Sequence, residues 1–202
     1  MKSNDPSLAP KQIPLDGFGE PPKATDRLFF ALYPEPPAKA LIAQLAQRLR
    51  TDHGLHGQPL GTDKFHVTLH HLGDYAGLPN DIVEKARKAA SAVAHRSFDV
   101  LFDHAASFAR GNRNRPFVLQ GDEGLASLMA FQKALGVQMA KAGLGREVEH
   151  SFTPHVTLLY DDEAVPRHPV DPVGWHVGEF VLVHSLIGQT THLSLGSWPL
   201  NG

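Results

Sequence analysis

Two short stretches decide how this chain is interpreted: FHVTLHHL at Phe65–Leu72 and HVTLLY at His155–Tyr160. Both contain the tetrapeptide His-Val-Thr-Leu, and both alternate polar and apolar side chains, which is typical of a half-buried β-strand. Because residues i and i+2 of a strand point to the same face, the first stretch predicts His66, Thr68 and His70 on one face. One copy of so short a motif would mean little, whereas two full copies in 202 residues are not expected by chance.

The elements predicted around these strands follow the same order twice. A buried strand and a proline-initiated helix precede the first motif strand, and a helix follows it; two strands and a helix precede the second. The predicted strands are 27–33, 65–72, 98–108, 116–120, 155–160, 178–186 and 192–198, and the helices are 36–50, 80–94 and 125–141. This order favours a duplicated, pseudo-twofold α+β fold with the two motif strands side by side in its middle.

Composition limits the class of protein. Residues 1–24 are rich in proline and glycine and lack periodicity, so we expect a disordered or loosely packed tail before a single bilobal domain at 25–202. The absence of cysteine excludes disulfides, thiolate catalysis and Cys-based zinc sites, and suits a reducing cytoplasm. A net charge of −2 excludes a broad basic surface for duplex nucleic acid. We expect a cytoplasmic monomer without membrane association, since no apolar run reaches about 18 residues.

The paired motifs suit in-line displacement at phosphorus. Two histidines from symmetric halves would face one cleft from opposite sides, one removing a proton from the attacking oxygen and the other protonating the leaving oxygen. The threonine hydroxyls could donate hydrogen bonds to the non-bridging phosphate oxygens. This scheme requires no metal and no cofactor.

The same residues resemble the 2H phosphoesterase superfamily, which is defined by two His-x-Thr/Ser-hydrophobic motifs. The similarity is greatest to the bacterial RNA 2',3'-cyclic phosphodiesterase family, also called 2'-5' RNA ligases. It runs from RLFFALY at residue 27 through HVTLHHLGD and FTPHVTLLYDD to FVLVHSLIG and HLSLGSWPL, and only the tail lies outside it. The resemblance implies two α+β lobes with antiparallel sheets, outer helices and an active-site cleft between the lobes. It also implies that His66 and His155 are catalytic and that Thr68 and Thr157 bind phosphate.

Two positions depart from the family pattern. His71 stands where close relatives usually carry Phe, and Tyr160 stands where they often carry Arg. The first change affects a stacking or packing contact, and the second removes a cation near the phosphate. Both bear on the substrate more than on the reaction.

Other candidate residues have more than one interpretation. Arg110, Arg113 and Arg115 form either a solvated loop or an RNA phosphate clamp. Phe152 is either a core residue or a stacking surface for a base. For His70 and His71, packing or nucleotide stacking is favoured over a zinc site. The zinc site would combine His66 and His70 with His53 or His56. We also expect HLSL at residues 192–195 to be a terminal strand and not a third motif, and Trp175 and Trp198 to anchor the core.

The predicted function is metal-independent hydrolysis of RNA 2',3'-cyclic phosphate ends to 2'-phosphates. The chain has neither a Walker loop nor a Gly-x-Gly-x-x-Gly fingerprint, which argues against an ATP-dependent ligase and a nicotinamide enzyme. Any 2'-5' RNA ligation would therefore be the reversal of the cyclic-phosphate chemistry. Two alternatives remain: a phosphodiesterase on small cyclic nucleotides or ADP-ribose cyclic phosphate, and a non-catalytic RNA- or nucleotide-binding module.

Overall fold

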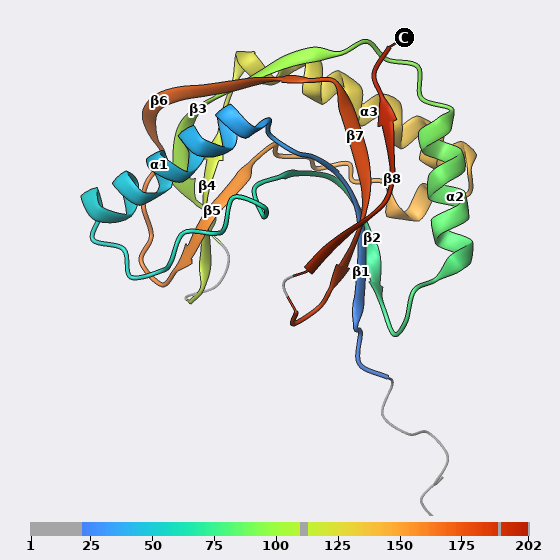
Figure 1. The fold of residues 1–202 in the computed structure, drawn as a ribbon, viewed down its shortest axis with the longest axis horizontal. Coiled ribbons are helices and arrows are strands. Elements are labelled where there is room, and N and C mark those ends of the chain that lie inside the picture. The colour runs from blue at the N-terminus through green and yellow to red at the C-terminus, as the bar shows by residue number, and fades with distance from the viewer. Residues whose placement is uncertain (1–21, 110–112, 190, 202) are drawn as a thin grey trace, which may run out of the picture.

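Two four-stranded antiparallel sheets form the framework of the molecule (Figure 1). The computed structural model describes residues 22–109, 113–189 and 191–201, so most of the predicted tail lies outside the described residues. The first sheet has the order β2-β1-β7-β8, with bounds Val67–Tyr75, Asp26–Leu32, Glu179–Leu186 and Thr191–Pro199. The second has the order β5-β4-β3-β6, with bounds Val156–Asp161, Arg115–Gln120, Phe98–Ser107 and His168–Val177.

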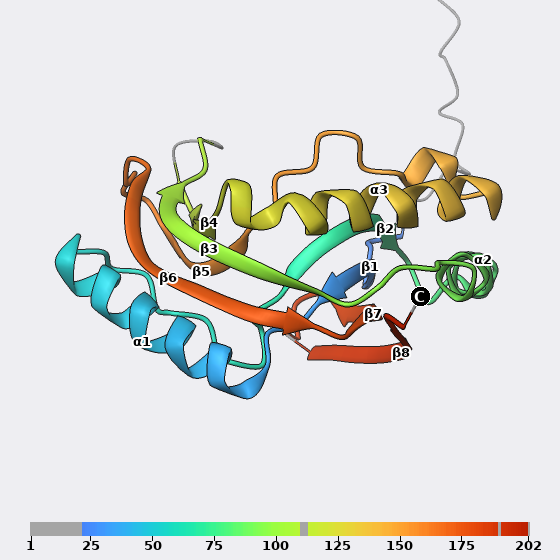
Figure 2. The same cartoon turned by 90° about the horizontal axis from the view of Figure 1, so that it is seen from above.

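Three α-helices lie outside the sheets: α1 (Pro36–Asp52), α2 (Asn80–Ser91) and α3 (Ala126–Lys141). Two 3-10 turns, η1 (Glu123–Leu125) and η2 (Gly145–Glu147), flank α3. Helix α1 follows β1 of the first sheet but contacts β5 and β6 of the second, whereas α3 contacts both β2 and β3 (Figure 2). The helices therefore interlock the two sheets. No helix in the described part of the chain is long and apolar enough to cross a membrane.

The predicted pseudo-twofold α+β fold is confirmed. The unit β1-α1-β2 in one lobe corresponds to β4-α3-β5 in the other, and each unit ends in a motif strand paired antiparallel to the strand before its helix. The two motif strands, expected side by side in the middle, are not paired with each other: β2 and β5 are each the edge strand of their own sheet. The loop before the first motif covers part of the β5 edge, where the N–H of Leu60 donates to the carbonyl oxygen of Leu158 at 2.8 Å.

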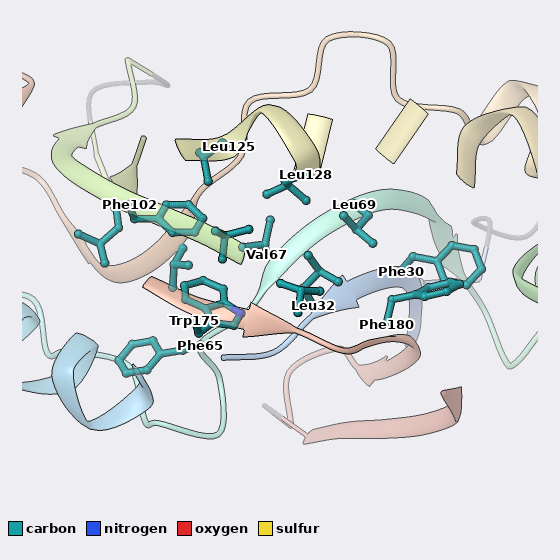
Figure 3. Close-up of a cluster of buried hydrophobic side chains, with 14 of the residues drawn as sticks. Phe30, Leu32, Phe65, Val67, Leu69, Phe102, Leu125, Leu128, Trp175 and Phe180 are labelled. Carbon is teal, nitrogen blue, oxygen red and sulfur yellow. The ribbon is translucent and has the colours of Figure 1, made fainter. Parts of the chain in front are cut away.

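A continuous apolar core joins the inner faces of both sheets (Figure 3). Phe30 packs against Phe180 at the first sheet, and Phe102 stacks on Trp175 at the second with ring centroids 5.1 Å apart. Strand β1 is buried on both faces apart from Arg27, which explains its nearly continuous apolar sequence. The predicted core roles of Trp175 and Trp198 agree with the structure, where Trp175 is buried and Trp198 packs against the core.

Strand β6 was not predicted from the sequence. Its segment HPVDPVGWHV contains two prolines, which remove backbone donors and argue against a strand in the middle of a sheet. Because β6 is an edge strand paired only with β3, it tolerates these prolines.

The loop before the first motif is held against the end of β5 by one buried carboxylate. Asp161 accepts hydrogen bonds from the backbone N–H groups of His56 (2.6 Å), Gly57 (2.7 Å) and Glu163 (2.9 Å). Burial acts to raise the pKa of Asp161, but these donors outweigh it and the pKa is lowered. Asp161 thus fixes the 53–63 loop beside the second motif strand.

We expect Asp161→Ala to lower the free energy of unfolding by about 2 kcal/mol or more, because it leaves buried N–H donors without an acceptor. Urea unfolding measures this change. The contribution should be present at neutral pH and be lost as pH falls through the lowered pKa of Asp161. The control is Asp171→Ala, which removes an exposed ion pair with Arg48 and should cost less than about 1 kcal/mol. Equal small effects of the two variants would contradict the anchoring role.

Candidate active site

Both motif strands contain the same irregularity directly after the threonine. In β2, Ala31 is opposite Thr68 and Phe30 is opposite His70, so Leu69 is an extra residue in the register. In β5, Val118 is opposite Thr157 and Phe117 is opposite Leu159, so Leu158 is the extra residue. Such a bulge reverses the alternation of faces beyond it. Residues 71 and 160 therefore share a face with the two threonines.

This bulge makes the predicted placement of His70 wrong. The alternation in the sequence placed His70 on the face of His66 and Thr68, but the structure buries it against α3. The zinc arrangement considered for it is not formed either, since His53 contacts His168, with the two Nε2 atoms 3.2 Å apart. Among the described residues, the one group with metal-ligand spacing is Asp103, His104 and Asp122, on β3 and at the start of η1.

The His66 ring is fixed by its neighbours on the first sheet. Its Nδ1–H donates to the carbonyl oxygen of Lys64 at 2.6 Å, because a carbonyl only accepts. In the neutral ring, Nε2 therefore carries the lone pair. The ring packs beside Phe29, Tyr33 and His192, with centroid separations of 5.2, 6.0 and 5.4 Å.

The pKa of His66 is lowered to about 4. Burial among these rings is the main cause, and the hydrogen bond to the Lys64 carbonyl opposes it. The positive charges of His192 and His155 lower the pKa further. His66 is consequently neutral at pH 7 and able to accept a proton.

His155 repeats this arrangement on the second sheet. Its Nδ1–H donates to the carbonyl oxygen of Thr153 at 2.7 Å, again two residues earlier in the chain. Phe108 packs edge-on against the ring at a centroid distance of 4.8 Å. The two halves thus impose the same tautomer on both histidines by the same local contact.

One cavity of about 670 Å³ brings together most of the predicted site residues. His155 and the two threonines contribute to its wall, together with the residues at the bulge-shifted positions. Its lining comprises Thr68, Leu69, His71, Phe108, Ala109, Asn114, Pro116, Glu149, Ser151, Phe152, Thr153, His155, Thr157 and Tyr160. Phe152 also packs against the core, in agreement with its core interpretation, and base stacking stays a prediction.

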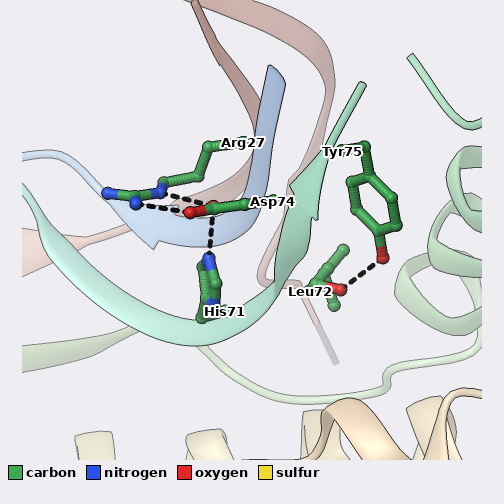
Figure 4. A network of polar contacts seen from close by, with 5 residues as sticks. All are labelled: Arg27, His71, Leu72, Asp74 and Tyr75. Carbon is green, nitrogen blue, oxygen red and sulfur yellow. Dashed lines mark hydrogen bonds and ion pairs between the residues drawn. The ribbon is translucent and has the colours of Figure 1, made fainter. Parts of the chain in front are cut away.

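The rim of this cavity carries a charged network on the first sheet (Figure 4). Asp74 accepts two hydrogen bonds from Arg27 at 2.7 Å and one from the Nε2 atom of His71 at 3.0 Å. The hydrogen bonds with Arg27 are the main reason that the pKa of Asp74 falls to about 2. Tyr160 lies close enough to influence the pKa of Arg27. Of this network, His71 lines the cavity from β2, and Tyr160 lines it from β5.

The arginine segment, interpreted as either a solvated loop or an RNA phosphate clamp, does not line this cavity with its described arginines. Within the described residues, Arg113 is exposed and Arg115 donates a hydrogen bond to the carbonyl oxygen of Asp162, and neither lines the cavity. Arg110 lies outside the described residues. The neighbouring Asn114 is the part of this segment that reaches the cavity wall.

His192 belongs to the neighbourhood of the site, which the sequence analysis missed. It lies in the terminal strand β8 as predicted, but its ring packs edge-on against His66 and its Nδ1 is 3.2 Å from the Tyr33 hydroxyl. Burial is the main cause of its lowered pKa. The near-match HLSL was a signal for this residue, but its proximity to His66 depends on the pairing of β8 with β7 and of β7 with β1.

Comparisons with known proteins agree with this fold. A family model described as the 2'-5' RNA ligase superfamily matches residues 34–186. E. coli LigT in its apo form has a TM-score of 0.66 and 24% identity, covering 89% of this chain and 100% of LigT. The protein TT0787 of Thermus thermophilus has a TM-score of 0.70 and 20% identity, covering 87% and 98% of the two chains. Among curated proteins no match is found.

A further solved structure is E. coli LigT complexed with 3'-AMP, with a TM-score of 0.62 and 26% identity over 89% of this chain and 100% of that one. The family model spans most of the chain and includes both motif strands. The fold, the paired histidines and this match lead to one conclusion: the chain belongs to the 2'-5' RNA ligase superfamily of 2H phosphoesterases.

Proposed function

We propose that this protein is a metal-independent phosphodiesterase that opens RNA 2',3'-cyclic phosphate ends to 2'-phosphates. The observation that carries the proposal is the matched pair of imidazoles, each held by an Nδ1–H bond to the carbonyl two residues before it. Two histidines with the same tautomer, one from each lobe, suit a reaction that removes a proton on one side of phosphorus and supplies one on the other. Family membership supports a phosphoesterase reaction.

In the proposed reaction, His66 is the base and His155 is the acid. Water attacks phosphorus while the Nε2 atom of neutral His66 takes a proton from it. The P–O3' bond breaks, and the Nε2–H of protonated His155 gives its proton to O3', which leaves a 2'-phosphate and a 3'-hydroxyl. The assignment follows from the lowered pKa of His66, which keeps that ring neutral at pH 7. Thr68 and Thr157 donate to the non-bridging oxygens, where negative charge accumulates.

The cavity lined by His155 and the two motif threonines suits the terminal nucleotide, and His66, two residues before Thr68, is not part of its lining. Its volume of about 670 Å³ lies within the usual range for small-molecule sites. The half-exposed ring of Tyr160 offers a stacking surface for the base, as aromatic side chains do for unpaired RNA bases. On the opposite side, His71 lines the cavity and is held by its hydrogen bond to Asp74.

Small cyclic nucleotides are the second candidate substrate class, because this cavity is large enough for a single nucleotide. Comparing nucleoside 2',3'-cyclic phosphates with short RNAs that carry the same end discriminates the two. Ligation would use the same site, with an RNA 5'-hydroxyl in place of the attacking water. A pure binding module would have no use for a histidine that is kept neutral beside a second histidine.

We expect His66→Ala and His155→Ala each to reduce turnover of a cyclic-phosphate RNA by at least about 100-fold, because each removes one proton transfer. The assay contains EDTA and follows the product by denaturing electrophoresis. The matched control is His176→Ala, an exposed histidine on β6 paired with Asp99, which should keep full activity. Near-full activity in either motif variant would refute the two-histidine mechanism, and loss of wild-type activity with EDTA would refute metal independence.

The acidic limb of kcat/KM against pH should lie near pH 4 and not near 6.5. The base must be deprotonated, so activity is lost only as pH falls through the pKa of His66, which is about 4. His192→Gln should move this limb upward, because it removes a positive neighbour and admits water to the ring. A wild-type limb near pH 6.5, or no movement in the variant, would contradict the assignment of His66 as the base.

A further inference from the structure

His70 directly follows the first tetrapeptide, yet it contacts the loop that leads to the second. Its side chain is buried, with 1% exposure. Nε2–H donates to the backbone carbonyl of Gln132 on α3 at 2.9 Å, and Nδ1 accepts from the backbone N–H of Glu149 at 3.0 Å. Because a carbonyl only accepts and an amide N–H only donates, these contacts require the neutral ring with its hydrogen on Nε2.

Gln132 on α3 also binds Glu149. Its side-chain amide donates to the carbonyl oxygen of Glu149 at 2.8 Å, so both backbone groups of Glu149 are bound by buried side chains. A buried polar group that loses its hydrogen-bond partner destabilises the fold. Any displacement of Glu149 that breaks these bonds is therefore unfavourable, and its position is well defined. We name the set His70, Gln132 and Glu149 the Glu149 clamp.

Gly136 on α3 gives independent support for the clamp. A glycine inside a helix costs about 1 kcal/mol relative to alanine, so its presence calls for a structural reason. A Cβ atom at Gly136 would lie 3.1 Å from Val148 and 3.3 Å from the His70 ring. The helix thus leaves room for this ring and for the residue that precedes Glu149.

The clamp lies four residues before the carbonyl that orients His155. Between them, the N–H of Ser151 donates to the Glu149 side chain at 2.8 Å, which ties the loop back to the clamp. Thr153 then presents its carbonyl oxygen to Nδ1 of His155. Displacement of Glu149 would therefore move the acceptor that sets the tautomer and the direction of this ring.

We infer that His70 and Gln132 are positioning residues that orient His155 through the loop 149–153. Since His70 lies on β2, four residues after His66, the clamp also fixes one motif histidine relative to the other across the two lobes. The consequence for turnover rests on the proposed function. The consequence for the His155 ring does not, and it can be measured without substrate.

The substrate-free test is NMR of ¹⁵N-labelled histidine side chains. In the wild type, neutral His155 should carry its proton on Nδ1. His70→Leu removes both ring contacts, and the expected result is a mixture of the two His155 tautomers. His70→Asn keeps an acceptor near the position of Nδ1 and should restore most of the wild-type signal. An unchanged His155 tautomer in His70→Leu would overturn the inference, whether or not the protein hydrolyses cyclic phosphates.

The kinetic test uses a cyclic-phosphate RNA. His70→Leu should reduce kcat at least about tenfold with a smaller change in KM, and His70→Asn should recover much of the loss. In the proposed reaction protonated His155 sets the basic limb of kcat/KM against pH, and this limb should move to lower pH in His70→Leu, because a weakened bond to the Thr153 carbonyl stabilises the charged ring less. A loss matched by a lower folded fraction, with the limb unmoved, would show a structural role only and overturn the inference.

Two further variants act on the clamp by other routes and serve if His70→Leu does not fold. Gln132→Leu removes the side-chain donor to the Glu149 carbonyl, and Gly136→Ala presses on the His70 ring and Val148. Both should alter the His155 tautomer in the same direction as His70→Leu, and unchanged spectra in both would overturn the inference.

Discussion

The hydrogen bond from an imidazole Nδ1–H to a backbone carbonyl two residues earlier, made once in each lobe, is the contact on which the site depends. It selects the tautomer, and in the proposed reaction Nε2 is the nitrogen of each ring that exchanges a proton. The contact is possible because both histidines lie directly before a strand, where the chain bends before it enters the sheet. The two sheets, the interlocking helices and the core fix the distance between these two points.

The two tetrapeptides are identical, so any difference between the histidines comes from their surroundings. His66 is packed among Phe29, Tyr33 and His192, and burial lowers its pKa. His155 lies at the wall of the cavity beside Phe108. Placing the same side chain in two environments is a common way to separate an acid from a base. In this chain, the two lobes differ in the residues that surround their motif histidines, and this departure from pseudo-twofold symmetry gives the two rings different environments.

Sequence patterning predicted the elements that depend on local periodicity: the motif strands, the three helices and the duplicated order. It did not predict the extra residues Leu69 and Leu158, because both are apolar and fit the alternation on either side of a bulge. The bulges placed His71 and Tyr160 in the cavity and His70 in the core. His192 and the Glu149 clamp depend on strand pairing and helix packing between distant segments, which periodicity does not report.

In the proposed reaction the two imidazoles act from opposite sides of phosphorus. A crystal structure with a nucleoside 2',3'-cyclic vanadate, whose five-coordinate vanadium mimics the transition state, tests this arrangement directly. The Nε2 atom of His66 should lie within hydrogen-bond distance of one apical oxygen, and the Nε2 atom of His155 within that distance of the other. Both nitrogens on the same side, or either ring turned away from the vanadate, would contradict it.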